Sequence, residues 1–281
     1  MYKIITNISM IEAQYNTFIF DIWGVLHNGS KIFNAANNCL LKLSHLKKNI
    51  ILLSNSPMSA NIVNAQLFKL GFFPEIKFST FTSGEYAASI INNLNHLFYL
   101  IGPKSHDSFR ELLSVKITHD IKSAGAIICT GFDKRIGDLK QHKAILEKVV
   151  DKGIKLYCVN PDKYAIINGN KIQCAGLIAQ YYNKIGGQVV FFGKPYVDIY
   201  KHIKKMISFN KNKSIAIGDS LVADIKGANQ FQLTSLLVLD GIHADEINRT
   251  SHTLKDNREQ IECLSSRYKV TPNYVMQSIQ W

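Results

Sequence analysis

The sequence lacks any hydrophobic run long enough to cross a membrane. A spanning helix needs roughly 18 or more apolar residues in succession, and no segment of the chain approaches that length. Residues 1–17 also lack the basic region, the long apolar run and the small-residue cleavage site of a signal peptide. We therefore expect a cytoplasmic protein with no membrane partner.

Cysteine is scarce, and its placement argues against a covalent or metal-bound framework. The chain has 5 cysteines, an odd number, and no Cys-x-x-Cys pair. Disulfide scaffolds and zinc sites use paired or closely spaced cysteines, so we expect neither. Cys129 and Cys158 lie in apolar segments, and we interpret them as buried thiols.

Acidic residues are fewer than basic ones, 21 against 33, so the formal net charge is +12. Such a balance favours nucleic acids or small anionic ligands as partners. The lysines are scattered, however, and no Arg-rich arm or basic-aromatic strand pattern occurs. We interpret most of them as solvated helix faces. The charge is compatible with a phosphorylated metabolite, and we expect no nucleic-acid partner.

The most informative stretch is residues 18–29, which reads Phe-Ile-Phe-Asp-Ile-Trp-Gly-Val-Leu-His-Asn-Gly. Its apolar start predicts a short buried strand, and Gly24 and the Asn-Gly pair at its end predict sharp turns. Asp21 is therefore expected at the carboxyl end of a strand, where open α/β sheets bind ligands. Taken alone, such an aspartate could equally be a turn or cap residue.

Three later segments repeat the pattern of an apolar strand that ends in a polar group. They end at Ser54-Asn55, at Gly193-Lys194-Pro195 and at Gly218-Asp219-Ser220, the last followed by Asp224. Together with Asp21 they supply carboxylates, a hydroxyl and a lysine.

This set of groups suits phosphoester chemistry. A carboxylate nucleophile can open a phosphoester through a covalent acyl-phosphate, and Mg²⁺ with oxygen ligands offsets the charge of the two anions. Asp21 and Asp219 can be its ligands, and Asp224 can hold a metal-bound water or orient Lys194. Ser54 and the Asn55 amide can bind phosphoryl oxygens, while Lys194 neutralises charge in the transition state. Singly, these residues could be a turn hydroxyl, a surface lysine and a helix-dipole acid.

With the four motifs in this order, the chain resembles the haloacid dehalogenase-like hydrolases. Within them it looks like class IIA, the branch of N-acetylglucosamine-6-phosphate and 4-nitrophenyl phosphatase-like enzymes. The resemblance covers nearly the whole chain, and residues 193–195 and 218–224 are its most specific part. It implies that Asp21 is nucleophile and metal ligand, that Ser54 and Lys194 bind phosphate, and that Asp219 and the Trp23 carbonyl bind Mg²⁺.

Alternating strand and helix patterns predict an α/β fold with a parallel sheet. Because about 100 residues of such pattern separate the second and third motifs, we predict a Rossmann-like core of residues 1–82 and 188–281 with an inserted α/β cap of residues 83–187. A strand from Val189 is expected to resume the core sheet, and residues 256–267 and 272–281 are expected to form terminal helices.

The resemblance implies a class IIA cap that closes over the core and selects the substrate. Asn160-Pro161-Asp162 lies at the end of a predicted cap strand. We take Asn160 and Asp162 as candidate substrate-binding residues, with a plain turn as the alternative.

The chain departs from the family pattern at Trp23. Phosphatases of the family carry a second aspartate there, which protonates the leaving group and then activates water. The indole N–H of a tryptophan is only a donor, and a general acid/base contributes roughly 10²–10⁴-fold. We expect slow hydrolysis, a substitute group such as His27, or a loss of turnover. His27 could also be an ordinary hydrogen-bonded loop histidine. The variant motif Asp-x-Trp-Gly-Val-Leu-His looks like the mark of a subgroup.

These observations predict a Mg²⁺-dependent phosphatase-like hydrolase of small phosphorylated metabolites, with an aspartyl-phosphate intermediate and weak turnover. One alternative is a non-catalytic phospho-ligand-binding or regulatory protein. Another is a phosphotransferase or phosphonate-type enzyme, in which a substrate acceptor replaces water. A homodimer is left open.

Overall fold

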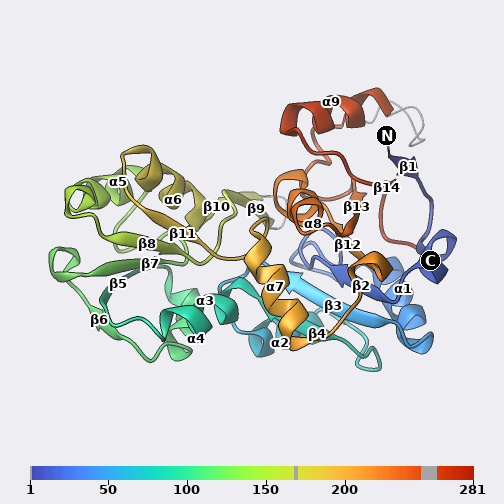
Figure 1. Ribbon diagram of the computed structural model, residues 1–281, viewed down its shortest axis with the longest axis horizontal. Helices are drawn as coiled ribbons and strands as arrows, with labels where there is room; N and C mark the ends of the chain where they lie inside the picture. The colour runs from blue at the N-terminus through green and yellow to red at the C-terminus, as the bar shows by residue number, and fades with distance from the viewer. Residues whose placement is uncertain (1, 168–169, 248–257) are drawn as a thin grey trace.

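The structure, a computed structural model, describes residues 2–167, 170–247 and 258–281. Its largest element is a seven-stranded sheet, here called the core sheet, in which every neighbouring pair of strands is parallel (Figure 1). Across the sheet the strands are β1 (Lys3–Ile4), β14 (Tyr274–Met276), β13 (Thr234–Val238), β12 (Ser214–Gly218), β2 (Thr17–Phe20), β3 (Asn49–Ser54) and β4 (Ser79–Thr82).

The core sheet is buried on both faces, which explains the continuous apolar runs of its central strands. Phe18 and Phe20 of β2 pack in one hydrophobic cluster with residues of α1 (Asn34–His45) and α2 (Ala60–Lys69). Ile19 points to the other face, because side chains alternate along a strand. There it packs in a second cluster with residues of α7 (Val197–Met206) and α8 (Lys226–Gln230).

A second parallel sheet, here called the cap sheet, lies beside the core sheet, at the left in Figure 1. Its strands are β11 (Val189–Phe191), β8 (Lys155–Cys158), β7 (Ala126–Cys129), β5 (Leu97–Ile101) and β6 (Lys116–Thr118), in that order. Ile127 and Leu156 pack with α5 (Leu139–Glu147) and α6 (Ala175–Lys184). Phe98 and Ile128 pack with α3 (Ser83–Ile91) and α4 (Asp107–Glu111).

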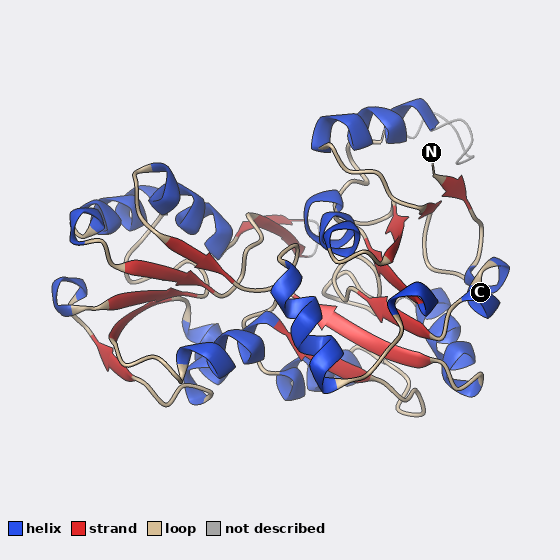
Figure 2. Ribbon diagram, in the orientation of Figure 1, coloured by secondary structure: helices blue, strands red, loops and turns tan. Residues whose placement is uncertain are grey.

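An antiparallel hairpin of β9 (Tyr164–Ile167) and β10 (Asn170–Gln173) lies between the two larger sheets (Figures 1 and 2). The last helix is α9 (Arg258–Tyr268). Short 3-10 helices cover Ile8–Met10, Glu12–Gln14, Lys104–His106, Ile121–Ser123, Val150–Lys152 and Lys211–Lys213, and a π-helix covers Leu221–Ile225. In the described part of the chain, no helix has both the length and the apolar character that a membrane span requires.

The predicted fold class is confirmed: a parallel-sheet α/β core carries an inserted α/β unit between β4 and β12. One strand was assigned to the wrong sheet. Val189–Phe191 pairs with β8 of the cap sheet instead of resuming the core sheet. Val189 and Phe191 pack on the hydrophobic cluster of the cap. A short apolar run does not reveal which sheet will bury it.

The predicted terminal helix at 272–281 was also wrong. Tyr274–Met276 forms β14 between β1 and β13, where all three side chains are buried. Burial in the sheet overrides the helical interpretation of this segment. The helix predicted at 256–267 is observed as α9, although residues 256 and 257 lie outside the described residues.

Candidate active site

Asp21 lies where sequence reasoning placed it, directly after β2. Its backbone N–H donates to the Ile217 carbonyl at 2.8 Å, which continues the β2–β12 ladder by one residue. The chain then turns through Gly24, whose φ of +75° favours glycine. A Cβ on Gly24 would lie only 2.0 Å from Oδ2 of Asp219, so the turn packs directly against the second carboxylate.

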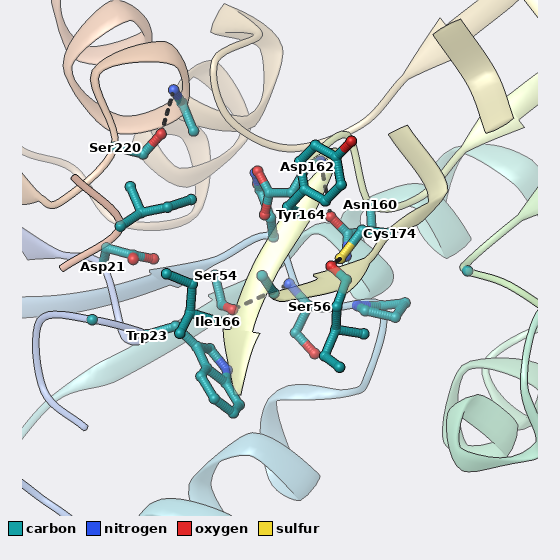
Figure 3. Close-up of a pocket in the computed structure, with 18 of the residues that line it drawn as sticks. Asp21, Trp23, Ser54, Ser56, Asn160, Asp162, Tyr164, Ile166, Cys174 and Ser220 are labelled. Atoms are coloured by element: carbon teal, nitrogen blue, oxygen red, sulfur yellow. Dashed lines mark hydrogen bonds between the residues drawn. The ribbon is translucent and has the colours of Figure 1, made fainter. Parts of the chain in front are cut away.

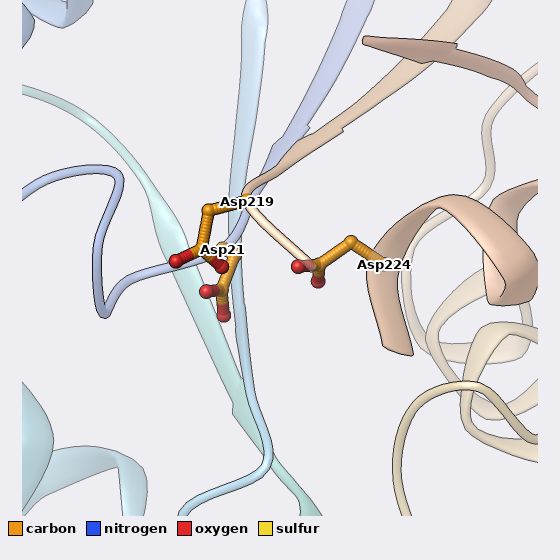
Figure 4. A group of neighbouring side chains, drawn as sticks. All are labelled: Asp21, Asp219 and Asp224. Carbon is orange, nitrogen blue, oxygen red and sulfur yellow. The ribbon is translucent and has the colours of Figure 1, made fainter. Parts of the chain in front are cut away.

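Asp219 and Asp224 join Asp21 in a cluster whose ligand oxygens all lie within 4.8 Å of one another (Figure 4). Asp219 follows β12, and its Oδ2 accepts a hydrogen bond from the Ile242 N–H at 2.7 Å. Asp224 belongs to the π-helix, and its Oδ2 accepts from the Ser220 N–H at 3.0 Å. Backbone donors thus fix both carboxylates from outside the cluster.

Crowding and burial change the acidity of these groups. Burial raises the pKa of Asp21 to about 7, with Lys194 opposing the rise and Asp224 adding to it. Burial also raises the pKa of Asp219 well above its usual range, reinforced by Asp21 and Asp224. Without a metal ion, Asp21 and Asp219 therefore favour bound protons, and a cation beside them would favour their ionised forms.

Lys194 supplies the positive charge of the site. Its Nζ donates to Oδ1 of Asp21, lies 2.7 Å from Oδ1 of Asp224 and donates to the Leu53 carbonyl at 3.0 Å. Burial alone would lower the pKa of Lys194, but the Asp21 and Asp224 carboxylates raise it above its usual value. The side chain is only 4% exposed, so it is a charged lysine enclosed by carboxylates.

Ser54 and Asn55, at the end of β3, reach the same place. The buried Ser54 hydroxyl accepts from the Ser56 N–H at 3.1 Å. The Asn55 side chain is bound to the main chain of Lys194, since its Oδ1 accepts from the Lys194 N–H at 2.7 Å and its Nδ2 donates to the Lys194 carbonyl at 3.0 Å. Two hydrogen bonds therefore connect the end of β3 to the segment that carries Lys194.

The loop after β8 brings Asn160 and Asp162 from the cap to this point. Oδ1 of Asp162 accepts from Nδ2 of Asn55 at 2.9 Å. Oδ1 of Asn160 accepts from the N–H of Asp162 at 3.0 Å. Asp162 thus contacts the core through a hydrogen bond between side chains 107 positions apart in the chain.

Trp23 lines the pocket, whereas His27 lies behind it. The rings of Trp23 and His27 pack edge to face, with their centroids 4.5 Å apart. His27 is 4% exposed, and its Nδ1 accepts from the Gly29 N–H at 2.9 Å. Burial lowers the pKa of His27 to about 4. His27 is thus a hydrogen-bonded loop histidine, the alternative stated from the sequence, and its burial outside the pocket lining argues against a role as the missing acid/base.

All these groups except His27 surround one cavity of about 540 Å³ between the core sheet and the cap (Figure 3). Ligand pockets commonly have volumes of roughly 300–1,000 Å³. Beside the polar cluster the wall is largely apolar. Its apolar and aromatic members include Trp23, Phe33, Met58, Phe132, Tyr164, Ile166, Ile172 and Ile242.

Sequence reasoning missed two parts of this wall. The hairpin residues Tyr164 and Ile166 face the pocket (Figure 3), and an Asn-Gly pair at 168–169, a typical hairpin signal, could have revealed the hairpin. Gly241 and Ile242, which pack on Asp219, carry no such signal. Their role depends on a contact between distant segments.

A model of the haloacid dehalogenase-like hydrolase family matches residues 15–232, which is most of the chain. The chain belongs to the haloacid dehalogenase-like hydrolase family. A second hydrolase-like model matches residues 191–279. The family assignment made from the four motifs is thus confirmed.

Individual relatives align over nearly their whole length. The 4-nitrophenylphosphatase of Schizosaccharomyces pombe is 26% identical, over 95% of this chain and 92% of its own. Mouse chronophin is 21% identical, and the alignment covers 96% of this chain and 92% of chronophin. These relatives agree with the class IIA branch, and the subgroup with tryptophan at position 23 stays a prediction.

Solved structures share the fold. A haloacid dehalogenase-like hydrolase from Brucella suis superposes with a TM-score of 0.84, at 24% identity, over 98% of this chain and 99% of that one. The p-nitrophenyl phosphatase from Archaeoglobus fulgidus superposes with a TM-score of 0.74 at 20% identity, and the alignment covers 94% of this chain and 97% of that one.

Proposed function

We propose that the protein is a Mg²⁺-dependent phosphatase that acts on small phosphorylated metabolites through a phosphorylated Asp21. The observation that carries this proposal is the buried Lys194 ammonium among the carboxylates of Asp21, Asp219 and Asp224 at the ends of parallel strands. The printed names of two relatives, 4-nitrophenylphosphatase and glycerol-3-phosphate phosphatase, support a phosphomonoester as the substrate.

The donor set fits a hard divalent cation. When ionised, the three carboxylates exceed the one ammonium by two negative charges, and carboxylate oxygens are preferred Mg²⁺ ligands. Asp21, Asp219 and the Trp23 carbonyl would hold the ion, and Asp224 would hold a metal-bound water or orient Lys194. When bound, Mg²⁺ supplies the charge compensation that lets an anionic phosphate approach an anionic nucleophile.

The chain's own groups then divide the work. The Asp21 carboxylate bonds to phosphorus as the bond from phosphorus to the leaving oxygen breaks. Lys194 neutralises charge on the phosphoryl group, and the Ser54 hydroxyl and Asn55 amide orient its oxygens. Water then releases the phosphate and regenerates Asp21. The apolar wall around Trp23 would contact the rest of the substrate.

Trp23 favours a second candidate, a protein that binds a phosphorylated ligand with little or no turnover. Trp23 is also compatible with a phosphotransferase or phosphonate-type reaction, in which a substrate acceptor replaces the water that a phosphatase must activate. The intact cluster of Asp21, Lys194, Asp219 and Asp224 favours the phosphatase.

The test is phosphate release from 4-nitrophenyl phosphate and a panel of sugar and nucleotide phosphates, in EDTA and in Mg²⁺. Release that needs Mg²⁺ and disappears in Asp21→Asn would support the phosphatase. Label trapped on Asp21 without release would point to transfer or stalled turnover. Ligand binding with neither release nor label would favour the binding protein.

A further inference from the structure

Asp162 is a pocket carboxylate that the proposed metal cluster does not use. It comes from the cap, whereas Asp21 and Ser54 come from the core, and all three line the same pocket (Figure 3). A fourth carboxylate beside an anion-binding site needs a reason, because it repels the phosphate that the site attracts. Asp162 lines the pocket together with the nucleophile but comes from the cap, so it can face the part of a substrate that lies beyond the phosphate.

The main chain of Asp162 is held firmly in place. Its carbonyl accepts from the Gly176 N–H at 3.0 Å, and its N–H donates to Oδ1 of Asn160 at 3.0 Å. A Cβ on Gly176 would lie 2.2 Å from the Pro161 carbonyl oxygen, so α6 packs directly on the loop. The carboxylate is therefore aimed by a rigid loop, as proton-transfer groups require.

The side chain is tied to the phosphate-binding motifs. Nδ2 of Asn55 donates to Oδ1 of Asp162 at 2.9 Å, and Asn55 is itself bound to the main chain of Lys194. These hydrogen bonds thus fix the position of the Asp162 carboxyl relative to Asn55 and Lys194. Oδ2 accepts no hydrogen bond that binds it elsewhere in the described structure, so it is available to the pocket.

The surroundings of Asp162 tune its acidity towards neutral pH. Burial raises the pKa of Asp162 to about 6, the Asn55 hydrogen bond and Lys194 oppose the rise, and Asp224 adds to it. The thiols of Cys158 and Cys174 are its other titratable neighbours, and burial keeps both protonated by raising their pKa. A carboxyl in this range exchanges protons readily near neutral pH.

We propose that Asp162 transfers the proton that an aspartate at position 23 would otherwise transfer. This inference rests on the proposed phosphatase function. In the first step Asp21 bonds to phosphorus, the bond to the leaving oxygen breaks, and that oxygen takes the proton from the Asp162 carboxyl. In the second step water bonds to phosphorus and gives a proton to the Asp162 carboxylate, while the bond to Asp21 breaks and phosphate departs.

The test compares the wild type with Asp162→Asn on phenyl phosphate and 4-nitrophenyl phosphate. Asparagine retains an oxygen that accepts from Asn55, so the loop keeps its anchor. We expect kcat for phenyl phosphate to fall by roughly 10²-fold or more. The first step with 4-nitrophenyl phosphate should change much less, because nitrophenolate leaves without a proton. Phosphorylated Asp21 should then accumulate, and the wild-type pH dependence due to Asp162 should disappear.

Rescue separates proton transfer from a structural role. Adding Trp23→Asp to Asp162→Asn should restore turnover, since it returns an acid at position 23. Asp133→Asn is the matched control, because Asp133 is a buried cap carboxylate that pairs with Arg135 and is not itself among the residues that line the pocket. It should lower stability and leave kcat unchanged.

Three results with the Asp162→Asn variant would overturn the inference. They are an unchanged kcat in Asp162→Asn, a rise in KM alone, and an equal loss for both substrates without accumulation of phosphorylated Asp21. A wild type that labels Asp21 but never turns over would overturn this inference and leave the first step of the proposed function standing. Neither label nor release would overturn both.

Discussion

Nζ of Lys194 lies 2.7 Å from Oδ1 of Asp224, while the same ammonium also binds Asp21. The lysine therefore joins the strand-end nucleophile to a carboxylate of the π-helix. Removal of this one charge would leave three crowded carboxylates with no cation among them in the absence of metal. The stability of the protein should consequently depend on Lys194 as strongly as its activity does.

Lys194→Met should inactivate the enzyme and destabilise it. Removing one partner of a buried ion pair costs about 3–5 kcal/mol. Because its pKa is raised, the ammonium gives its full stabilisation below roughly pH 10 and loses it only as the pH rises through the folded-state value. Urea unfolding in EDTA should show a larger loss of stability at pH 8 than at pH 5, where Asp21 and Asp219 can take up protons.

Lys201→Met is the control for this variant. Lys201 pairs with Asp198 on the solvent face of α7, where both side chains are more than 60% exposed. It should leave both stability and activity nearly unchanged. Equal effects of the two substitutions would contradict the role given to Lys194.

Asp21→Asn should make the metal-free protein more stable at pH 8. The folded-state pKa of Asp21 is raised to about 7, so folded protein retains a proton that the unfolded chain releases near pH 4. Stability due to this group falls as the pH rises from about 4 to 7, and asparagine removes that loss. Melting temperatures in EDTA should decline from pH 5 to pH 8 more steeply for the wild type.

Mg²⁺ should make the wild type more stable than Asp21→Asn, which reverses the order of stability expected in EDTA. Added at pH 8, it should raise the melting temperature of the wild type by binding the folded state, with little effect on Asp21→Asn, which lacks one carboxylate ligand. A wild type that is indifferent to Mg²⁺, or an asparagine variant less stable than the wild type in EDTA, would refute this account.

Gly24→Ala should weaken the response to Mg²⁺ and the activity together. The new Cβ would lie 2.0 Å from Oδ2 of Asp219, so the turn or the carboxylate must move. Gly153→Ala provides the comparison, because Gly153 has φ of +66° and nothing within 4 Å of its added Cβ. It should cost only the roughly 1–2 kcal/mol of left-handed strain. Titration of activity against Mg²⁺ should shift for Gly24→Ala and stay in place for Gly153→Ala.

The strand ends of the site could be predicted because each is encoded locally. The apolar runs before Asp21, Ser54 and Asp219 are buried on both faces of one sheet, and the carboxyl ends of neighbouring parallel strands meet at one edge. The residues that follow those runs are thereby brought together without any knowledge of the loops.

Other features could not be predicted because they depend on which distant segments pack together. The run before Lys194 is as apolar as a core strand, yet β8 of the cap binds it. The bond from Asn55 to Asp162 joins residues 107 positions apart, and no local pattern in either segment specifies its partner. The two interpretations of His27 could not be separated for the same reason, since only the fold shows that its ring is buried against Trp23.

His27→Asn should lower stability without changing the pH dependence of catalysis. The pKa of His27 is lowered to about 4, so the ring is neutral above pH 5 and gains no charge where the enzyme would work. A lowered histidine pKa means that this group destabilises the folded state as the pH falls from about 6.5 towards 4. The variant should therefore lose less stability than the wild type over that range, although it starts lower because Trp23 loses its packing partner. The catalytic measurement is the profile of kcat/KM between pH 5 and 8. This profile should keep its shape in His27→Asn, as it should in the control His45→Asn on the exposed face of α1. If the rise or the fall of kcat/KM with pH is lost in the His27 variant alone, the histidine takes part in proton transfer, and the burial of its ring behind Trp23 does not decide its role.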